Sequence, residues 1–374
     1  SGRAEGIIFM SIQAGIRTPG TYIGVNINTQ RTGLPANTHK VLFITTDNKV
    51  MDQPVEIYDE SDATAKIGVD SIVGRMIKAA VKTNRLVDVQ AITLAMNTTD
   101  PQAPVPDVDD TTEIIAPLGH TILVLDKPPA IGDETEAWVD HLNFVSDAIE
   151  QRPAIIVVPF SDIEAATLFA AQATVETSYR VVAACYHGAT GQEAEIGAAM
   201  AAALADSNDP ALPFNGVNLN GVEAVEDKYK LTFERQERAL KAGVCIIATG
   251  ADGKPEIVRA ISTFRKNPDS GLADDIMLDI NGVLTIDYVR LVMRTAASKE
   301  RRRKNTAAQR RNLRSIFLTE AKKLEKAEIL ENVTSTADQL TVIQDNTDKT
   351  RANAEIPSHW VRGMHVIATT LNVY

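Results

Sequence analysis

The chain has 374 residues, of which 44% are hydrophobic and 23% are charged, as is typical of a folded globular protein with room for two domains. It contains 38 Lys and Arg against 49 Asp and Glu, a net charge of −11. No uncharged apolar run is long enough for a membrane helix, so no membrane insertion is expected. The two cysteines, Cys185 and Cys245, lie in apolar runs and are predicted to be buried, reduced thiols.

The first two thirds of the chain predict an extended arm followed by alternating strands and helices. A strand is expected over residues 22–28, within an arm of about forty residues, and a polar, turn-rich stretch follows it. Asp62 and Ser71 are candidate N-caps of two helices, and residues 97–110 are expected to form an exposed loop. Strands are then predicted at residues 41–45, 87–94, 121–125, 154–158 and 180–185, with helices at 63–67, 71–82, 134–149, 163–174 and 193–205. This alternation predicts a layered α/β domain.

A second unit is predicted from Thr232 onward. Residues 233–241 are expected to form a helix, and strands at 244–249 and 255–264 flank a hairpin turn at 250–253. Helices are predicted at 286–297 and 307–330, and residues 364–374 alternate like a strand. The chain is therefore expected to be extended at both ends.

The sequence contains few signs of catalytic or metal chemistry. It has no phosphate-binding loop, no dinucleotide fingerprint and no nucleophile elbow, and its six histidines never pair at helical spacing. The acidic residues Asp107, Asp109, Asp110, Asp274 and Asp275 are interpreted as solvated loop charges. We therefore expect no catalytic residues, no cofactor and no metal, and a protein that is not an enzyme.

One segment has a net positive charge, opposite in sign to that of the whole chain. Residues 285–326, the basic segment, contain 13 Lys and Arg against 4 Asp and Glu, a net of +9, which leaves −20 for the rest. Within its second helix Leu313, Phe317, Ala321 and Leu324 form one apolar stripe, so the cations are expected to face outward. The candidate contact residues are Arg301, Arg302, Arg303, Lys304, Arg310, Arg311 and Arg314.

Several anionic partners fit this charge. A solvated face without a partner is one alternative, and nucleic acid is another, although the segment offers no outward aromatic side chain for base stacking. A membrane surface would require a broader apolar face. An acidic protein surface therefore fits best.

Five motifs resemble those of contractile phage tail sheath proteins, specifically the Mu-like group. Residues 234–244 resemble the family's helix, residues 253–264 its hairpin and residues 286–290 the start of its next helix. Residues 8–22 look like its N-terminal arm, and residues 361–374 are similar to its terminal strand. The chain is short for the Mu-like group, and its cluster at residues 301–303 has no firm counterpart there.

The resemblance implies a two-domain α/β (α+β) tail sheath fold. It implies an N-terminal arm over residues 1–30, an outer α/β domain over 31–230, an inner domain over 231–351 and a C-terminal arm over 352–374, the inner domain being built from both chain ends. The arms would exchange strands between subunits, through Tyr22, Ile23, Val25, Ile27, His365, Val366, Ile367, Ala368 and Thr370.

The resemblance also implies partners. Copies would stack as hexameric rings around a tail tube protein, between a baseplate and a tail terminator, in a virion tail made in the host bacterial cytoplasm. The basic residues would face the tube, and no direct contact with nucleic acid is expected. A basic-patch nucleic-acid-binding virion protein remains the alternative, followed by an α/β hydrolase-like enzyme.

Overall fold

The computed structural model describes residues 33–97 and 105–372. The chain divides into two units, residues 1–34 and 35–374, and every element below belongs to the second. The strand predicted over residues 22–28 lies outside the described residues.

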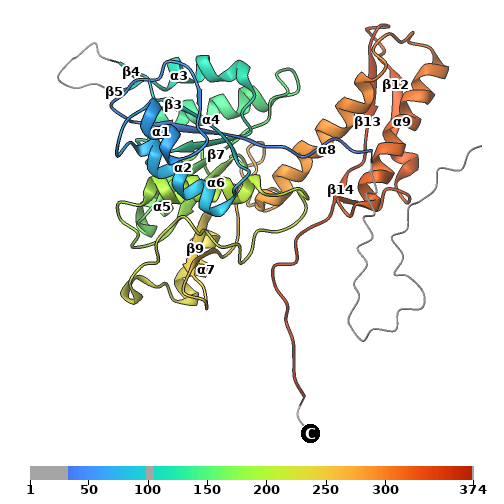
Figure 1. Ribbon diagram of the computed structural model, residues 1–374. Helices are drawn as coiled ribbons and strands as arrows, with labels where there is room; N and C mark the ends of the chain where they lie inside the picture. Colours follow the sequence, from blue (N-terminus) through green and yellow to red (C-terminus); the bar gives the residue numbers. More distant parts are fainter. Residues whose placement is uncertain (1–32, 98–104, 373–374) are drawn as a thin grey trace, which may run out of the picture. The chain divides into compact units, whose positions relative to one another are not determined.

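A mixed sheet of eight strands forms the centre of the larger unit (Figure 1). Its order is β10-β9-β8-β7-β6-β1-β3-β2; the inner pairings are parallel, and the edge strands β2 and β10 are antiparallel. The strands are β1 (Lys40–Thr45), β2 (Val55–Glu56), β3 (Asp88–Thr93), β6 (Ile122–Leu125), β7 (Ile155–Phe160), β8 (Val181–Cys185), β9 (Val244–Thr249) and β10 (Pro255–Ile257). β6, β7 and β8 are buried throughout, because helices cover both faces of the sheet.

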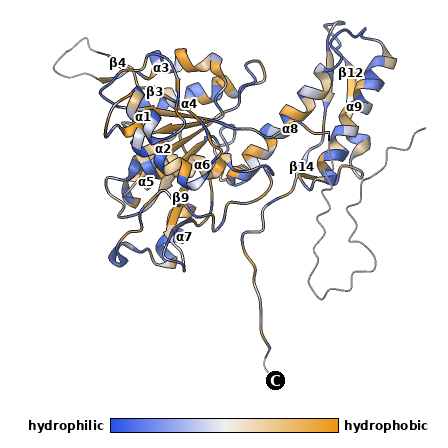
Figure 2. Cartoon of the chain, in the orientation of Figure 1, coloured by the Kyte–Doolittle hydropathy of each residue, from blue (hydrophilic) through white to orange (hydrophobic). Residues whose placement is uncertain are grey.

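Alternate residues of each strand belong to two separate cores. Val41 and Phe43 pack with α2 and α6 on one face, whereas Leu42 and Ile44 pack with α3, α4 and α5 on the other. Figure 2 shows apolar residues concentrated on the strands between these helices. The helices are α1 (Glu60–Lys66), α2 (Ile72–Thr83), α3 (Val108–Ile115), α4 (Asp133–Ser146), α5 (Ile163–Ala170), α6 (Glu193–Ala205) and α7 (Phe233–Lys241).

The helix caps test two predictions from the sequence. Ser71 caps α2, because its side chain accepts a hydrogen bond from the backbone N–H of Gly74. The predicted cap Asp62 is wrong: Asp59 caps α1, and the backbone N–H of Asp62 donates to the Asp59 carboxylate. The helix therefore begins one turn earlier than expected.

Residues 97–110 are not one continuous loop. β4 (Met96–Asn97) pairs with β5 (Val105–Pro106), and Asp107 caps α3 through the backbone N–H of Asp110. Asp107, Asp109 and Asp110 thus belong to a helix start rather than to a loop, and the interpretation from the sequence is wrong for these three residues. Acidic side chains are favourable there because they oppose the helix dipole.

The large sheet continues past Thr232, where the sequence predicted a second unit. β9 pairs in parallel with β8, and the predicted hairpin joins β9 to β10. The second strand of that hairpin ends at Ile257 rather than at residue 264. The next residues turn toward the start of β8, where the buried side chain of Thr263 donates to the carbonyl of Val175 at 2.8 Å.

The last hundred residues form two long helices and two small sheets. α8 (Ile280–Ser298) packs with its first turns in the core of the sheet and contacts α9 (Ala307–Lys326). α9 ends before Glu328, which adopts a left-handed φ of 58°, so the predicted helix over residues 307–330 is four residues too long. The small strands are β11 (Leu330–Glu331), β12 (Thr341–Gln344), β13 (Ala352–Glu355) and β14 (His359–Trp360); β11 pairs with β14 and β12 with β13.

None of the helices in the described ranges has both the length and the apolar character required to cross a bilayer.

Candidate functional site

The apolar stripe of α9 is buried as the sequence predicts. Phe317, Ala321 and Leu324 are buried and Leu313 is partly buried, which holds α9 against α8 and β12. The cations of the helix consequently point away from the core, as a solvated or partner-binding face requires.

The seven candidate contact residues divide into two groups. Arg314 donates to the carbonyls of Leu340 and Ala337, each at 2.6 Å, and Arg310 donates to the backbone and side-chain oxygens of Asn305. Arg303 forms an ion pair with Glu300. These three guanidinium groups therefore stabilise the chain's own loops, in addition to lying off the apolar stripe of α9.

The other four candidates are exposed. Arg301, Arg302, Lys304 and Arg311 make no hydrogen bond or ion pair through their side chains with any residue that the structure describes. Lys299, Lys322 and Lys326 share this environment. The cations available to a partner are thus Lys299, Arg301, Arg302, Lys304, Arg311, Lys322 and Lys326, which we call the free cations.

A buried ion pair fastens α8 to the sheet. Arg180, 3% exposed, precedes β8 and donates to both oxygens of Asp287 at 2.8 and 3.0 Å. One turn further along α8, Arg290 donates to the carbonyls of Ser146 and Asp147 at the end of α4, and Arg294 donates to Gln151. These contacts fasten the first part of the basic segment, on α8, to the large sheet and to the end of α4.

The C-terminal segment begins against the folded body and then becomes exposed. β14 contacts α8, and His365 lies 3.4 Å from Asp279 and is within hydrogen-bonding distance of Asn215. Beyond it, Val366, Ile367 and Leu371 are 81%, 78% and 87% exposed, and residues 361–372 have no strand or helix (Figure 1). The predicted terminal strand thus has no pairing partner in one copy of the described chain.

A short hairpin beside α9 has open edges. β12 and β13 pair only with each other in the described part of the chain, and Ile343 on β12 is 58% exposed. Arg310, Arg311 and Arg314 of α9 line a shallow hollow with Val342 and Ile343. Unpaired strand edges next to a basic helix are chemically suited to bind a further strand.

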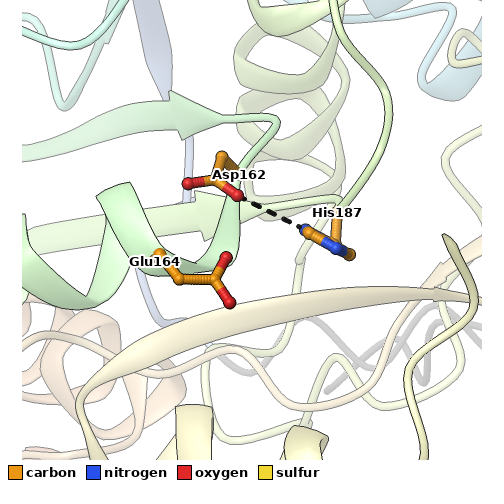
Figure 3. Close-up of side chains that lie close together, drawn as sticks. All are labelled: Asp162, Glu164 and His187. Carbon is orange, nitrogen blue, oxygen red and sulfur yellow. Dashed lines mark ion pairs between the residues drawn. The ribbon is translucent and has the colours of Figure 1, made fainter.

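No sequence motif predicts the cluster of two carboxylates and a histidine that lies beyond the carboxyl ends of β7 and β8. Asp162, Glu164 and His187 converge there, with Nδ1 of His187 3.7 Å from Asp162 (Figure 3). Each group already has a role: Asp162 caps α5, Glu164 pairs with Arg235 at 3.0 Å, and Nδ1 of His187 accepts the N–H of Ile163. A cation would compete with Arg235 and with the positive end of α5, so the donor set is poorly suited to a metal.

Both cysteines are buried free thiols, as predicted. Burial raises the pKa of Cys245 to about 12 and also raises the pKa of Cys185. Neither thiol is therefore activated for nucleophilic chemistry.

The structure also reveals an acidic surface that the sequence reasoning missed. α3 and α4 pack together, and their exposed positions carry Asp109, Asp110, Glu113, Asp133, Glu136 and Asp140, which we call the acidic face. A count of charge over residues 105–150 finds 11 acidic residues and one basic residue, a signal equal in strength to that of the basic segment.

The end of the chain matches a known family. The family described as "Phage tail sheath C-terminal domain" covers residues 273–374. This region contains α8, α9, both small sheets and the C-terminal segment. No curated protein matches the chain.

Solved structures share the fold over nearly the whole chain. The crystal structure of a sheath tail protein from Desulfitobacterium hafniense is 13% identical with a TM-score of 0.62, covering 92% of this chain and 97% of that one. The helical sheath of the anti-feeding prophage in its contracted state is 15% identical with a TM-score of 0.64, covering 96% and 99%. A sheath tail protein from Listeria innocua is 11% identical with a TM-score of 0.58, covering 84% and 90%. The chain therefore has the tail sheath fold.

Proposed function

We propose that this protein is the structural subunit of a contractile tail sheath, which stacks in rings around a tail tube and shortens to drive the tube through a host envelope. The observation that carries the proposal is the shared fold with contracted sheaths over 96% and 95% of the chain. The family match over residues 273–374 supports it independently. Such a role requires assembly surfaces and no catalytic centre.

The exposed C-terminal segment and the β12–β13 hairpin support strand exchange between copies. The segment presents the exposed apolar side chains of Val366, Ile367 and Leu371, and the hairpin has open edges. A strand added from a neighbour would supply main-chain hydrogen bonds that persist while the linker bends. His365 contacts the body of its own chain, so residues 366–372 are the better candidates for the exchanged strand.

The basic segment is proposed to face an acidic tube. Arg301, Arg302, Lys304 and Arg311 are the exposed members of the candidate set, whereas Arg303, Arg310 and Arg314 position loops beside them. Exposed charge pairs contribute about 0–1 kcal/mol each. A contact of this kind holds in one state of a sheath and releases in another.

The domain organisation is proposed with one change. The arms remain residues 1–30 and 352–374, but continuity of the sheet through β10 favours an outer part that extends to the start of α8 at Ile280. The inner part then begins with α8 rather than at residue 231.

Partners and placement follow from the same role. Two of the similar structures are baseplates of the anti-feeding prophage, which supports association with a baseplate as well as with other sheath copies. A tail terminator, a virion tail location and synthesis in the bacterial host are further parts of the proposal. The motifs at residues 234–264 favour the Mu-like group.

Imaging of the purified protein tests the proposed function. We expect negative-stain micrographs to show rings or tubes, because a sheath subunit carries its own assembly contacts. A monodisperse monomer at every concentration, with or without a tube protein, would overturn the proposal. Controls should include the mass of the particles by light scattering.

A further inference from the structure

We propose that the acidic face of α3 and α4 binds the basic segment of a second copy of this chain. This inference rests on the proposed function, because it concerns how sheath copies hold one another. It adds a surface and a partner for residues that the strand-exchange contacts do not use.

The two surfaces carry nearly equal and opposite charge. Residues 105–150 have a net charge of −10, and residues 285–326 have a net charge of +9, while the whole chain carries −11. In a polymer of identical copies each contact brings one surface of each sign, so complementarity is built into the sequence.

Neither surface is neutralised within one copy. The six acidic side chains of the acidic face form no ion pair with any described residue, and neither do the seven free cations. Glu136 and Asp140 lie one turn apart on α4, an arrangement of like charges that destabilises an isolated helix. A partner with cations relieves this repulsion.

The acidic face also offers apolar area. Phe144 near the end of α4 is 53% exposed and Ile149 just beyond it is 83% exposed. A contact that covers Phe144 and Ile149 would bury apolar surface as well as pair charges. A helix that is only solvated has no need of exposed apolar side chains at these positions.

A second copy explains these features better than another partner. Nucleic acid would be repelled by the acidic face, whereas the required cations are present in every copy. A contact between two different surfaces of identical chains is heterologous and generates rings or open helical polymers. The free cations have two acidic partners in this scheme, and without a tube they are available to the second copy.

A charge swap tests the inference in the full-length protein without tube. The acidic variant is Glu113→Lys, Glu136→Lys and Asp140→Lys; the basic variant is Arg301→Glu, Arg302→Glu and Lys304→Glu. Each should raise the concentration needed for assembly by about tenfold or more, since like charges then meet. In an equimolar mixture of the two variants, some contacts still bring surfaces of opposite charge together. The chain that combines all six changes restores opposite charges at every contact, so its assembly concentration should lie within about threefold of that of the wild type.

The matched control is Asp52→Lys, Asp269→Lys and Asp275→Lys, three exposed positions with the same change in net charge. It should assemble like the wild type, and circular dichroism should show every variant folded. Normal assembly of the acidic variant, or no rescue in the sixfold variant, would overturn this inference and leave the sheath proposal intact. Failure of the wild type to assemble at any concentration, both without tube protein and with it, would instead reject both.

Discussion

At the scale of residues, Arg180 and Asp287 show why the end of the sheet and the start of α8 behave as one body. The guanidinium is almost fully buried, donates to both carboxylate oxygens and also reaches the carbonyl of Ala154. Tyr179 stacks against it, with the guanidinium carbon 5.0 Å from the ring centroid. A buried charge held this way depends strongly on its partner.

Loss of one partner should therefore cost more than loss of the pair. Asp287→Ala should lower the free energy of unfolding by about 3–5 kcal/mol, because a buried guanidinium is left unpaired, and Arg180→Met with Asp287→Leu should recover much of that loss. Urea denaturation followed by circular dichroism measures both. Glu237→Ala, which breaks an exposed pair on α7, is the control and should change stability by less than about 1 kcal/mol. A loss of unfolding free energy that is the same for Asp287→Ala and Glu237→Ala would contradict this prediction.

The same scale shows what charge patterns alone leave undecided. Arg311 and Arg314 lie one turn apart in a basic helix, yet Arg311 is free and Arg314 binds two carbonyls near β12. The sequence predicts that both lie off the apolar stripe. It contains no signal for the return of residues 337–340 to the helix, because that contact depends on tertiary folding.

At the scale of elements, strands with continuous apolar runs were predicted well. β1, β6, β7 and β8 lie where the sequence predicts, since burial on both faces leaves a pattern that few other elements produce. β9 has the same pattern and was also predicted as a strand, but its pairing with β8, which continues the sheet past residue 231, cannot be derived from local residues. The acidic face was missed because Asp109 and Asp110 were interpreted as loop charges, and because the packing of α3 against α4 cannot be derived from local residues.

The C-terminal segment supports a prediction at this scale. Deleting residues 366–374 should abolish tube formation while leaving thermal unfolding unchanged, since residues 366–372 are exposed in one copy and Trp360 and His365 remain in place. Deleting residues 1–27 is expected to have the same effect on assembly. Sedimentation and micrographs measure assembly, and the variant Asp52→Lys, Asp269→Lys and Asp275→Lys, changed at three exposed positions outside both arms and the hairpin, serves as a control. Normal polymers from either truncated chain would rule out strand exchange by that arm.

At the scale of the whole molecule, charge is sorted along the chain rather than mixed. The basic segment carries a net charge of +9 and the remainder of the chain −20. The basic segment therefore attracts acidic surfaces, whereas the remainder of the chain repels polyanions. This separation of charge favours binding to an acidic protein over the coating of nucleic acid. A protein that coats nucleic acid should have a binding surface that is basic throughout.

The last prediction distinguishes these two roles. At physiological salt the protein should assemble around purified tube protein and should not retard a DNA fragment, because the acidic remainder opposes a polyanion. Arg301→Glu with Arg302→Glu and Arg311→Glu should abolish tube association without unfolding the chain, since these three side chains have no partner among the described residues. Raising the salt to 1 M, where screening acts over about 3 Å, should also weaken the association of the wild-type protein with the tube.

Tight DNA retardation that falls steeply with salt, together with no binding to tube, would favour the nucleic-acid-binding alternative. Because the variant removes charge but no buried contact, these results distinguish an acidic tube from nucleic acid as a partner of the basic segment, in addition to the second copy of the chain.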